Sequence, residues 1–471
     1  MKSVCLLLAV GVLCVALSGC TAHAPESKIG SAAAMAPGSW AATKQGRAGV
    51  DRNWVRRFDD SRLTSLVDEA LSNNLDLRVA AERVRRAEAT ARFVGGSRLP
   101  QASAGLSGRR QQQRFIGFPF GGSLISENYG ASLDVNWEVD LWGRVRAGQS
   151  AALGEMQAAG FDLQSAQTSL AGQLVKGWFA LGEANEQIAL ARLALEIRTD
   201  TFETIRDRFE RAIDGEGGTG SQMRLAQTDV ASARAVLAQW EGVREQALRQ
   251  IEVLAGRYPS GKNLSDRGLP ALPSRPPAGL PSELLLRRPD ILAAERRFAA
   301  SGRKVREARL ALWPSFSLSG SLGSATDSLD EILDSSFGIW SLGAGVVQPI
   351  FTGGRATSEM RVRESDERAA LGTLQQTVLT AFGEVEEALV AETYLARRCR
   401  AQLEASKLAE AAAAAAVADY ADGAGDVLTL LATQTRRIET ARQLVSLKRA
   451  RLDNRVNLHL ALGGSFTSKA K

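Results

Sequence analysis

Cys20 is the residue whose setting points most directly to a chemical reaction. Lys2 gives a basic start, and Val4 to Leu17 form an apolar stretch of about fourteen residues, too short to span a bilayer as a mature helix. Leu17-Ser18-Gly19 then precede the cysteine, which fits a bacterial lipobox, where a lipid is joined to the thiol and the chain is cut before it. We predict a signal peptide at residues 1–19 and a covalent lipid, with palmitate, on Cys20.

The residue after Cys20 indicates a destination. Thr21 stands there rather than Asp, and by resemblance to bacterial lipoproteins this favours the outer membrane over the inner one. The alternative is an ordinary signal peptide with an incidental cysteine nearby. Cys5 and Cys14 leave with the signal, so Cys399 is the one remaining thiol and no internal disulfide is expected.

Other reactive groups are sparse. His23 and His459 are the only histidines, and no Cys, His and Asp residues share a metal-ligand spacing. Nothing pairs a nucleophile with a base, and the glycines at 215–220 precede no Gly-Lys-Ser/Thr, so they form no phosphate loop. We therefore expect no enzyme, no metal and no cofactor other than the lipid on Cys20.

The charge pattern argues against nucleic acid as a partner. The 471 residues carry a net charge of +6, but acidic and basic residues alternate along the helical stretches without a clustered basic run. Aromatic residues make up only 6% of the chain while Ala and Arg are plentiful, which favours long helices over an aromatic-rich core.

An internal repeat with a constant offset of 214 residues organises the chain (position 290 against position 76). The first copy is Asp76-Leu77-Arg78-Val79-Ala80, then Arg83, Arg92 and Pro100; the second is Asp290-Ile291-Leu292-Ala293-Ala294, then Arg297, Arg306 and Pro314. A fixed period of this kind indicates that one structural unit was duplicated.

In each repeat the hydrophobic period changes to two after the proline. Residues 102–107 alternate, residues 129–140 give six apolar–polar pairs, and residues 316–322 and 340–347 repeat the scheme. Strands of about ten to twelve residues suit a tilted membrane crossing. The acidic polar face predicts that Asp134, Asn136 and Glu138 face a water-filled lumen; the alternative is the edge of a soluble sandwich.

The remainder of each repeat is helical. Helices are predicted from Asp59 to Arg98 and from about Leu284 to Leu312, before each pair of strands. Proline-free stretches then run from Arg144 to about Asp214 and from Arg355 to about Asp422, which at 1.5 Å per residue is on the order of 100 Å each. Shorter helices return after glycine-rich turns, Ser221 to Gly256 and Val427 to Gly463. Rods this long suit a hollow helical tube.

The strand count predicts the assembly. Four strands cannot close a barrel, for which about eight is the practical minimum. An open edge cannot face lipid, because its backbone groups would stay unpaired. Three chains would supply twelve strands, so the fold class we predict is a mixed one: four membrane strands per chain in a trimeric twelve-stranded β-barrel, joined to a long periplasmic α-helical coiled-coil barrel, with internal duplication.

These patterns set the predicted boundaries. They are a signal peptide at 1–19, a lipidated tether at 20–58, a first repeat at 59–268, a proline-rich linker at 269–282, a second repeat at 283–464 and a tail at 465–471.

With these features the chain resembles the TolC/OprM (NodT-type) outer-membrane efflux lipoproteins. The motifs that carry the resemblance are Leu280-Pro281-Ser282-Glu283-Leu284-Leu285 with Arg287-Arg288-Pro289-Asp290-Ile291, Ala294-Glu295-Arg296-Arg297, Trp137-Glu138-Val139-Asp140-Leu141-Trp142-Gly143-Arg144, Gln348-Pro349-Ile350-Phe351 with Gly353-Gly354-Arg355, and Leu460-Ala461-Leu462-Gly463-Gly464. The resemblance implies a homotrimer that spans the periplasm from the outer membrane. It also implies docking to a periplasmic adaptor (membrane fusion protein) and an inner-membrane RND transporter, for passive export of small toxic compounds or drugs.

The periplasmic ends of the helices are the predicted gate. The glycines that let the tips turn toward an adaptor are Gly215, Gly217, Gly218, Gly220, Gly423 and Gly425. Leu428 and Leu431 are predicted to form an apolar constriction, with Asp426 and Asp422 as nearby charges. Ala432 stands where the family often has Asp and Thr435 where it often has Arg, so the usual charged latch is absent. Thr21-Ala22-His23-Ala24-Pro25 also replaces the family's usual Gly-Pro-aromatic motif.

Two other functions stay open at this point. The same fold serves as the outer-membrane duct of type I protein secretion systems. A lipid-anchored periplasmic coiled-coil scaffold without a pore is the alternative from another class, although the four amphipathic strands argue against it.

Overall fold

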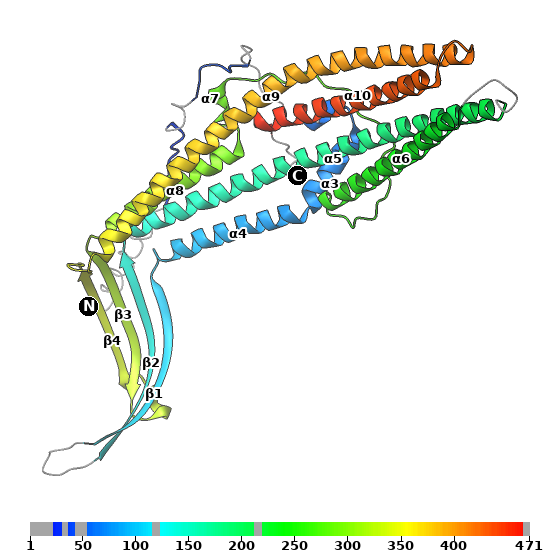
Figure 1. The fold of residues 1–471 in the computed structure, drawn as a ribbon. Helices are drawn as coiled ribbons and strands as arrows, with labels where there is room; N and C mark the ends of the chain where they lie inside the picture. Colours follow the sequence, from blue (N-terminus) through cyan, green and yellow to red (C-terminus); the bar gives the residue numbers. More distant parts are fainter. Residues whose placement is uncertain (1–21, 31–35, 43–53, 115–122, 212–218, 465–471) are drawn as a thin grey trace. The chain divides into compact units, whose positions relative to one another are not determined.

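The computed structural model describes residues 22–30, 36–42, 54–114, 123–211 and 219–464 (Figure 1). The chain divides into two compact units: unit 1 comprises residues 1–31, 82–160 and 293–375, and unit 2 comprises 32–81, 161–292 and 376–471. Each unit takes segments from both sequence repeats. The predicted signal peptide and Cys20, residues 115–122 and the predicted tail at 465–471 lie outside the described residues.

Helices dominate the described chain, and the strands lie between them in two pairs. The elements in order are η1 (Trp54–Phe58), α3 (Ser61–Asn73), α4 (Leu75–Gly96), β1 (Gln101–Arg114), β2 (Ser123–Val139), α5 (Arg144–Arg211), α6 (Gly220–Leu254), α7 (Pro281–Leu284), α8 (Pro289–Leu310), β3 (Ser315–Thr326), η3 (Leu329–Glu331), η4 (Ser335–Phe337), β4 (Gly338–Val347), α9 (Arg355–Ala421) and α10 (Val427–Ala461).

The helix predicted from Asp59 to Arg98 is in fact two helices. Asp60 caps α3 by accepting from the backbone N–H groups of Arg62 and Leu63, and α3 stops at Asn74, whose backbone is extended. The Asn74 amide oxygen accepts from the N–H of Leu77, and its nitrogen donates to the Leu254 carbonyl. An asparagine side chain competes with helical hydrogen bonds in this way, so it ends one helix and starts the next.

The second predicted helix is divided too. It begins as the single turn α7, and after four residues α8 starts at Pro289, where a missing N–H costs nothing and φ is already helical. Apart from these breaks the predicted helices match, and the long α5 and α9 end within three residues of the predicted positions.

The predicted tether is shorter than expected at its C-terminal end. Trp54, Val55 and Phe58 of η1 are buried, and they pack in the core of unit 2 with residues such as Leu174 and Phe179. The Trp54 ring also stacks on buried His459, with centroids 5.5 Å apart. This end of the predicted tether is therefore part of the folded core.

The four strands form one antiparallel sheet in the order β1-β2-β3-β4 (Figure 1). Both outer strands, β1 and β4, have one edge without a partner within the described chain. β1 and β2 are longer than their alternating patterns predicted, because polar residues 108–114 pair with 123–129 beyond the alternating region. Hydrogen bonding between two backbones does not require an apolar face, so the ladder continues where the pattern stops.

The strand register sorts side chains by polarity. One row across the four strands is Ala104, Leu133, Leu322 and Trp340; the next row is Ser103, Asp134, Ser321 and Ser341. Because partners opposite each other share a face of the sheet, one face is apolar and the other is polar or small. Leu322, Trp340 and Leu342 of the apolar face are strongly exposed in the single chain.

Aromatic side chains gather where the strands meet the helices in unit 1. Trp142 packs against Trp313 and Phe316, with centroids 5.1 and 6.1 Å apart. The indole N–H of Trp142 donates to the Pro314 carbonyl, and that of Trp137 donates to the Arg98 carbonyl. A belt of this kind is typical of the boundary between lipid and water, where an apolar ring needs a polar end.

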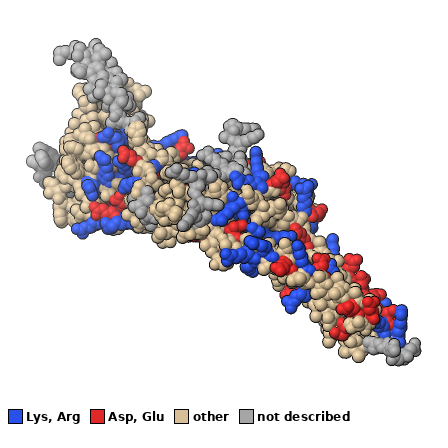
Figure 2. All heavy atoms as spheres, turned by 90° about the horizontal axis from the view of Figure 1, so that it is seen from above, with Lys and Arg blue, Asp and Glu red and all other residues tan. Residues whose placement is uncertain are grey.

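Charged residues are unevenly distributed between the strands and the helices. β3 and β4 contain no charged residue, whereas basic and acidic side chains are mixed over the helices on the face drawn in Figure 2. Among the described residues, no helix combines the length and apolar character required to span a membrane.

The sidedness of the sheet can be tested at neighbouring positions of β3. Leu322→Lys should reduce the amount of folded protein in membranes, because a lysine on a lipid face costs about 2–4 kcal/mol near the bilayer centre. Ser321→Lys, on the polar face, is the matched control and should assemble normally. Membrane fractionation of both variants is the measurement, and equal losses would contradict the assignment of faces.

Candidate functional site

The polar face of the sheet holds the residues predicted to line the lumen. Asp134, Asn136 and Glu138 fall on one face of β2, opposite Ser321, Ser319 and Ser317 of β3. The Asp134 carboxylate accepts a hydrogen bond of 2.7 Å from the Ser132 hydroxyl. The face thus offers small hydroxyl groups around one carboxylate, a surface that water can wet.

Glu138 is a different case, because its charge is already paired. Both of its carboxylate oxygens accept from the Arg144 guanidinium, at 2.7 and 2.8 Å. Bidentate pairs of this kind are among the stronger charge-assisted hydrogen bonds. Of these two carboxylates, Asp134 is therefore the one whose negative charge would favour cations in a water-filled lumen.

The turn between α9 and α10 lies within the described residues. Gly423 has a φ of +78°, a conformation that other residues adopt only with strain. The N–H groups of Ala424 and Gly425 both donate to the Asp419 carbonyl at 2.9 Å, which satisfies a carbonyl at the helix end. Asp422 is exposed in this turn. The glycines predicted to let this tip turn are thus placed in the turn itself.

Asp426 has a structural task that the sequence did not reveal. Its carboxylate caps α10 by accepting from the N–H groups of Leu428 and Thr429, at 2.8 and 3.0 Å, and from the Thr429 hydroxyl at 2.6 Å. These bonds hold the pKa of Asp426 below its usual range, because they stabilise the ionised carboxylate. Asp426 is therefore an N-cap whose charge also lies at the tip.

The two leucines predicted as a constriction have different surroundings. Leu428 is 60% exposed, whereas Leu431 is 5% exposed and packs with Ile205, Ala226 and Val427. A side chain held in the packing between helices cannot line an opening, so the constriction hypothesis now depends on Leu428. The two leucines are three positions apart in the sequence, and this spacing alone did not show which one packs inside.

At the other tip, Gly215, Gly217 and Gly218 lie outside the described residues. Gly220 is the first residue of α6, preceded by Thr219 in a capping box with Gln222. The Thr219 hydroxyl accepts from the Gln222 N–H, and the Gln222 side chain accepts from the Thr219 N–H at 2.9 Å. The Thr-x-x-Gln pattern could have been found from sequence.

An arginine that sequence reasoning missed connects three helices near these tips. Arg198 of α5 forms an ion pair with Asp229 of α6 and donates to the Thr435 hydroxyl of α10 at 2.7 Å. The cation in this contact thus comes from α5, and Thr435 of α10 is its acceptor. No local pattern marks Arg198, because its partners are 31 and 237 residues away.

Two further contacts join α5 to α10 and to α9. The Gln434 amide donates to the Thr201 hydroxyl at 3.0 Å, and both side chains are buried. The Arg208 guanidinium donates to the Tyr420 carbonyl at 2.8 Å and lies 4.1 Å from the centroid of the Tyr420 ring. Polar contacts, which have a small net value each, therefore hold α5 against α9 and α10 in this region.

The described residues contain no group of three or more His, Cys, Asp or Glu that could hold a metal ion. They also show no nucleophile activated by a base. Cys399 is a free thiol, half-buried in α9.

Comparison with known proteins places this architecture. A family model described as "Outer membrane efflux protein" matches residues 66–257 and 280–464. OpmQ of Pseudomonas aeruginosa, named as a pyoverdine export outer membrane protein, is 31% identical over 97% of this chain and 96% of its own length. SrpC of Pseudomonas putida, named as a solvent efflux pump outer membrane protein, is 30% identical over 87% of each chain.

Solved structures agree with these relatives. The outer-membrane channel OprN aligns with a TM-score of 0.85 and 31% identity, covering 91% of this chain and 96% of OprN. The open state of the MtrE outer-membrane channel of Neisseria gonorrhoeae aligns with a TM-score of 0.79 and 28% identity, covering 94% and 97%.

Capping and charge at Asp426 can be separated by substitution. Asp426→Ala removes the acceptor and should increase amide hydrogen exchange in the first turn of α10. Asp426→Asn keeps an acceptor and should leave exchange near the native value. Since the folded-state pKa is lowered, the native cap is intact above the ordinary aspartate pKa and weakens as pH falls below it. Equal exchange in both variants would contradict the capping role.

The charge on the polar face of the sheet has its own test. Asp134→Asn should shift the reversal potential of the reconstituted protein in a salt gradient toward anions, because one carboxylate per chain is lost. Glu138→Gln should shift it less, since Arg144 already offsets that carboxylate, although it also leaves Arg144 without its partner. An unchanged ion preference in Asp134→Asn would remove Asp134 from the conduction path.

Proposed function

The chain belongs to the outer membrane efflux protein family, and we propose that it works as a homotrimeric exit duct in a tripartite efflux pump. The protein is an outer-membrane efflux channel. In the proposal, three copies share one barrel, and the duct receives small toxic compounds from a periplasmic adaptor and an inner-membrane RND transporter.

The observation that carries the trimer is the open sheet. Within the described chain its four strands leave two edges unpaired, and the sheet has one apolar face and one polar face. Unpaired N–H and C=O groups cost several kcal/mol each in lipid, so these edges need partners. Three copies placed in sequence would pair β1 of one with β4 of the next and give a closed barrel of twelve strands.

The helices supply the part that crosses the periplasm. α5 and α9 contain 68 and 67 residues, so each is on the order of 100 Å long. Each is followed by a shorter helix of 35 residues that runs back beside it (Figure 1). The tips of these hairpins are where we expect an adaptor to bind.

Opening is proposed as a population shift between two packings of the tip helices. The polar contacts of Arg198 and Gln434 favour the packing described here, and adaptor binding would favour the other. The channel itself consumes no energy in this scheme, and the transporter selects the cargo. Named cargoes of relatives, such as pyoverdine and solvents, make toxic small molecules the substrate class proposed for this chain.

Single-channel conductance of the purified protein in planar bilayers tests the duct. Wild-type protein should show a small conductance, and Leu428→Ser should raise it several-fold, because an apolar constriction is lost. Leu408→Ser on α9 is the matched control, since Leu408 is exposed to a similar extent, 65%, and lies away from the turn. An unchanged small conductance in Leu428→Ser would reject Leu428 as the constriction.

The assembly needs a separate measurement. The full lipidated protein, crosslinked in its own cells and purified, should bring down an adaptor and an RND transporter. Recovery of an ABC exporter instead would favour type I protein secretion. Absence of any conductance, even after the tip contacts are removed, would favour the scaffold without a pore.

A further inference from the structure

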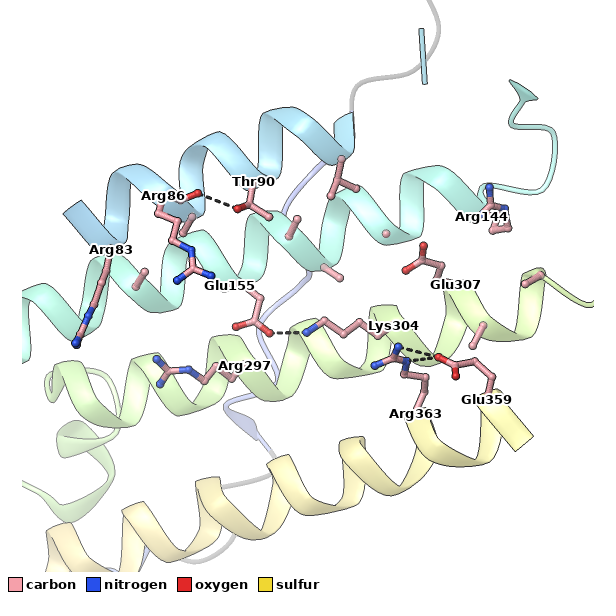
Figure 3. A pocket seen from close by; sticks show the side chains of 18 residues that line it. Arg83, Arg86, Thr90, Arg144, Glu155, Arg297, Lys304, Glu307, Glu359 and Arg363 are labelled. Atoms are coloured by element: carbon pink, nitrogen blue, oxygen red, sulfur yellow. Dashed lines mark hydrogen bonds and ion pairs between the residues drawn. The ribbon is translucent and has the colours of Figure 1, made fainter. Parts of the chain in front are cut away.

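Unit 1 contains a charged cavity that the proposed duct does not by itself explain. The cavity has a volume of about 750 Å³ and is lined by residues of α4, α5, α8 and α9 (Figure 3). Six basic residues line it: Arg83, Arg86, Arg144, Arg297, Lys304 and Arg363. The acidic residues of the lining are Glu155, Glu307 and Glu359, so the lining has an excess of three positive charges.

The internal repeat explains how this concentration of charge arises. Arg83 and Arg297 occupy equivalent positions at the constant offset of 214, and both line the cavity. The same offset relates Thr90 to Lys304, which also line it on opposite sides. The two repeats therefore face each other across the cavity, and duplication places a guanidinium on each side.

Some of these cations are already neutralised. Lys304 pairs with Glu155 at 2.8 Å, and Arg363 pairs with Glu359 at 2.7 Å. Arg144 is bound by Glu138, as described above. These pairs account for the nearby acids except Glu307, whose pKa is raised by burial, so that it is the acid least suited to carry a full charge.

Arg83 and Arg86 are in a different position. Neither guanidinium has a hydrogen-bond or ion-pair partner among the described residues, and both side chains are exposed. Figure 3 shows them extending from α4 toward α8, the helix that carries Arg297. Two adjacent guanidiniums, one helical turn apart on α4, thus have their donors available at one wall of the cavity.

The N-terminal segment indicates which way the cavity opens. The Lys28 N–H donates to Glu295, and its ammonium lies 4.5 Å from the Phe298 ring centroid and 2.9 Å from Glu367. At 100° per residue, Glu295 and Phe298 lie on the side of α8 opposite to Arg297 and Lys304. In the proposed duct, a segment that leads to a lipid on Cys20 would run on the outside of the barrel, and the cavity would then face the inside.

We propose that this cavity is an anion-binding station of the duct, which takes small organic anions that carry carboxylate groups. Arg83 and Arg86 supply the primary contacts, and Arg297 faces them. Guanidinium and carboxylate match in a bidentate geometry, and a wall of one charge sign raises the local concentration of the opposite ion. The assignment of this face to the channel interior rests on the proposed function, whereas the binding itself does not.

Binding of citrate to the full-length lipidated protein in detergent, followed by calorimetry, tests the site. Arg83→Gln/Arg86→Gln should weaken the affinity for citrate at least about tenfold, which corresponds to about 1.4 kcal/mol. The matched control is Arg85→Gln/Arg92→Gln on the same helix. These arginines pair with Glu82 and Glu88 and do not line the cavity. The control double variant removes the same number of positive charges from α4 as Arg83→Gln/Arg86→Gln does, but away from the cavity.

A second measurement does not depend on the choice of citrate. In planar bilayers with a potassium chloride gradient, Arg83→Gln/Arg86→Gln should move the reversal potential toward potassium, and the control should move it less. Absence of citrate binding together with an unmoved reversal potential would overturn the anion site, as would an equal effect of the control in both measurements.

The two proposals can fail separately. A protein that binds citrate through Arg83 and Arg86 but conducts no ions keeps the anion site and rejects the duct. A protein that conducts normally, without citrate binding or a shift in the double variant, keeps the duct and rejects the anion site.

Discussion

The unpaired edges of the four-stranded sheet are the constraint on which the rest of the structure depends. A backbone N–H or C=O group finds no hydrogen-bonding partner in lipid, so an open sheet is stable in a bilayer only when another chain completes it. The apolar face of the sheet requires lipid, and its polar face requires water. In the proposed barrel, oligomerisation therefore follows from the backbone, before any particular side chain at an interface is considered.

The duplicated sequence adds a second level of organisation. Each compact unit takes segments from both repeats, so the two repeats do not fold as two separate domains along the chain. In unit 1 this places equivalent arginines opposite each other, while in unit 2 it sets the two long hairpins side by side. The same duplication thus produces the charged cavity of unit 1 and, in unit 2, the polar contacts that join α5 to α9 and α10.

Much of this could be predicted from the sequence because it depends on local periodicity. Alternation over 129–140 identified the strand with its polar face, and proline-free stretches gave the ends of α5 and α9 closely. Breaks made by a single side chain were missed, as at Asn74, where the deciding hydrogen bond joins residues 180 positions apart. The burial of Leu431 between helices was missed for the same reason. Periodicity shows which face of a helix is apolar, but it does not show which other helix covers that face.

The candidate site divides in the same manner. Gly423 lies in the turn after α9 and Asp134 lies on the polar face of the sheet, as their residue types and local pattern indicated. Arg198 was missed because its role exists only once α5, α6 and α10 are brought together, and Asp426 was assigned a charge role when its geometry is that of a cap. Long helices make this division sharp, since the contacts of Arg198 with Thr435 and of Gln434 with Thr201 join helices far apart in the sequence.

With the predicted lipid on Cys20, the contacts of Lys28 with Glu295 and Glu367 would limit where the protein sits relative to the bilayer surface. Only eight peptide steps separate Lys28 from Cys20, and a fully extended chain covers roughly 27 Å over that span. The acyl chains of a lipidated Cys20 would insert no farther than that from Glu295. The lipid and the contacts of Lys28 together would limit the distance between the first turns of α8 and the inner leaflet of the outer membrane.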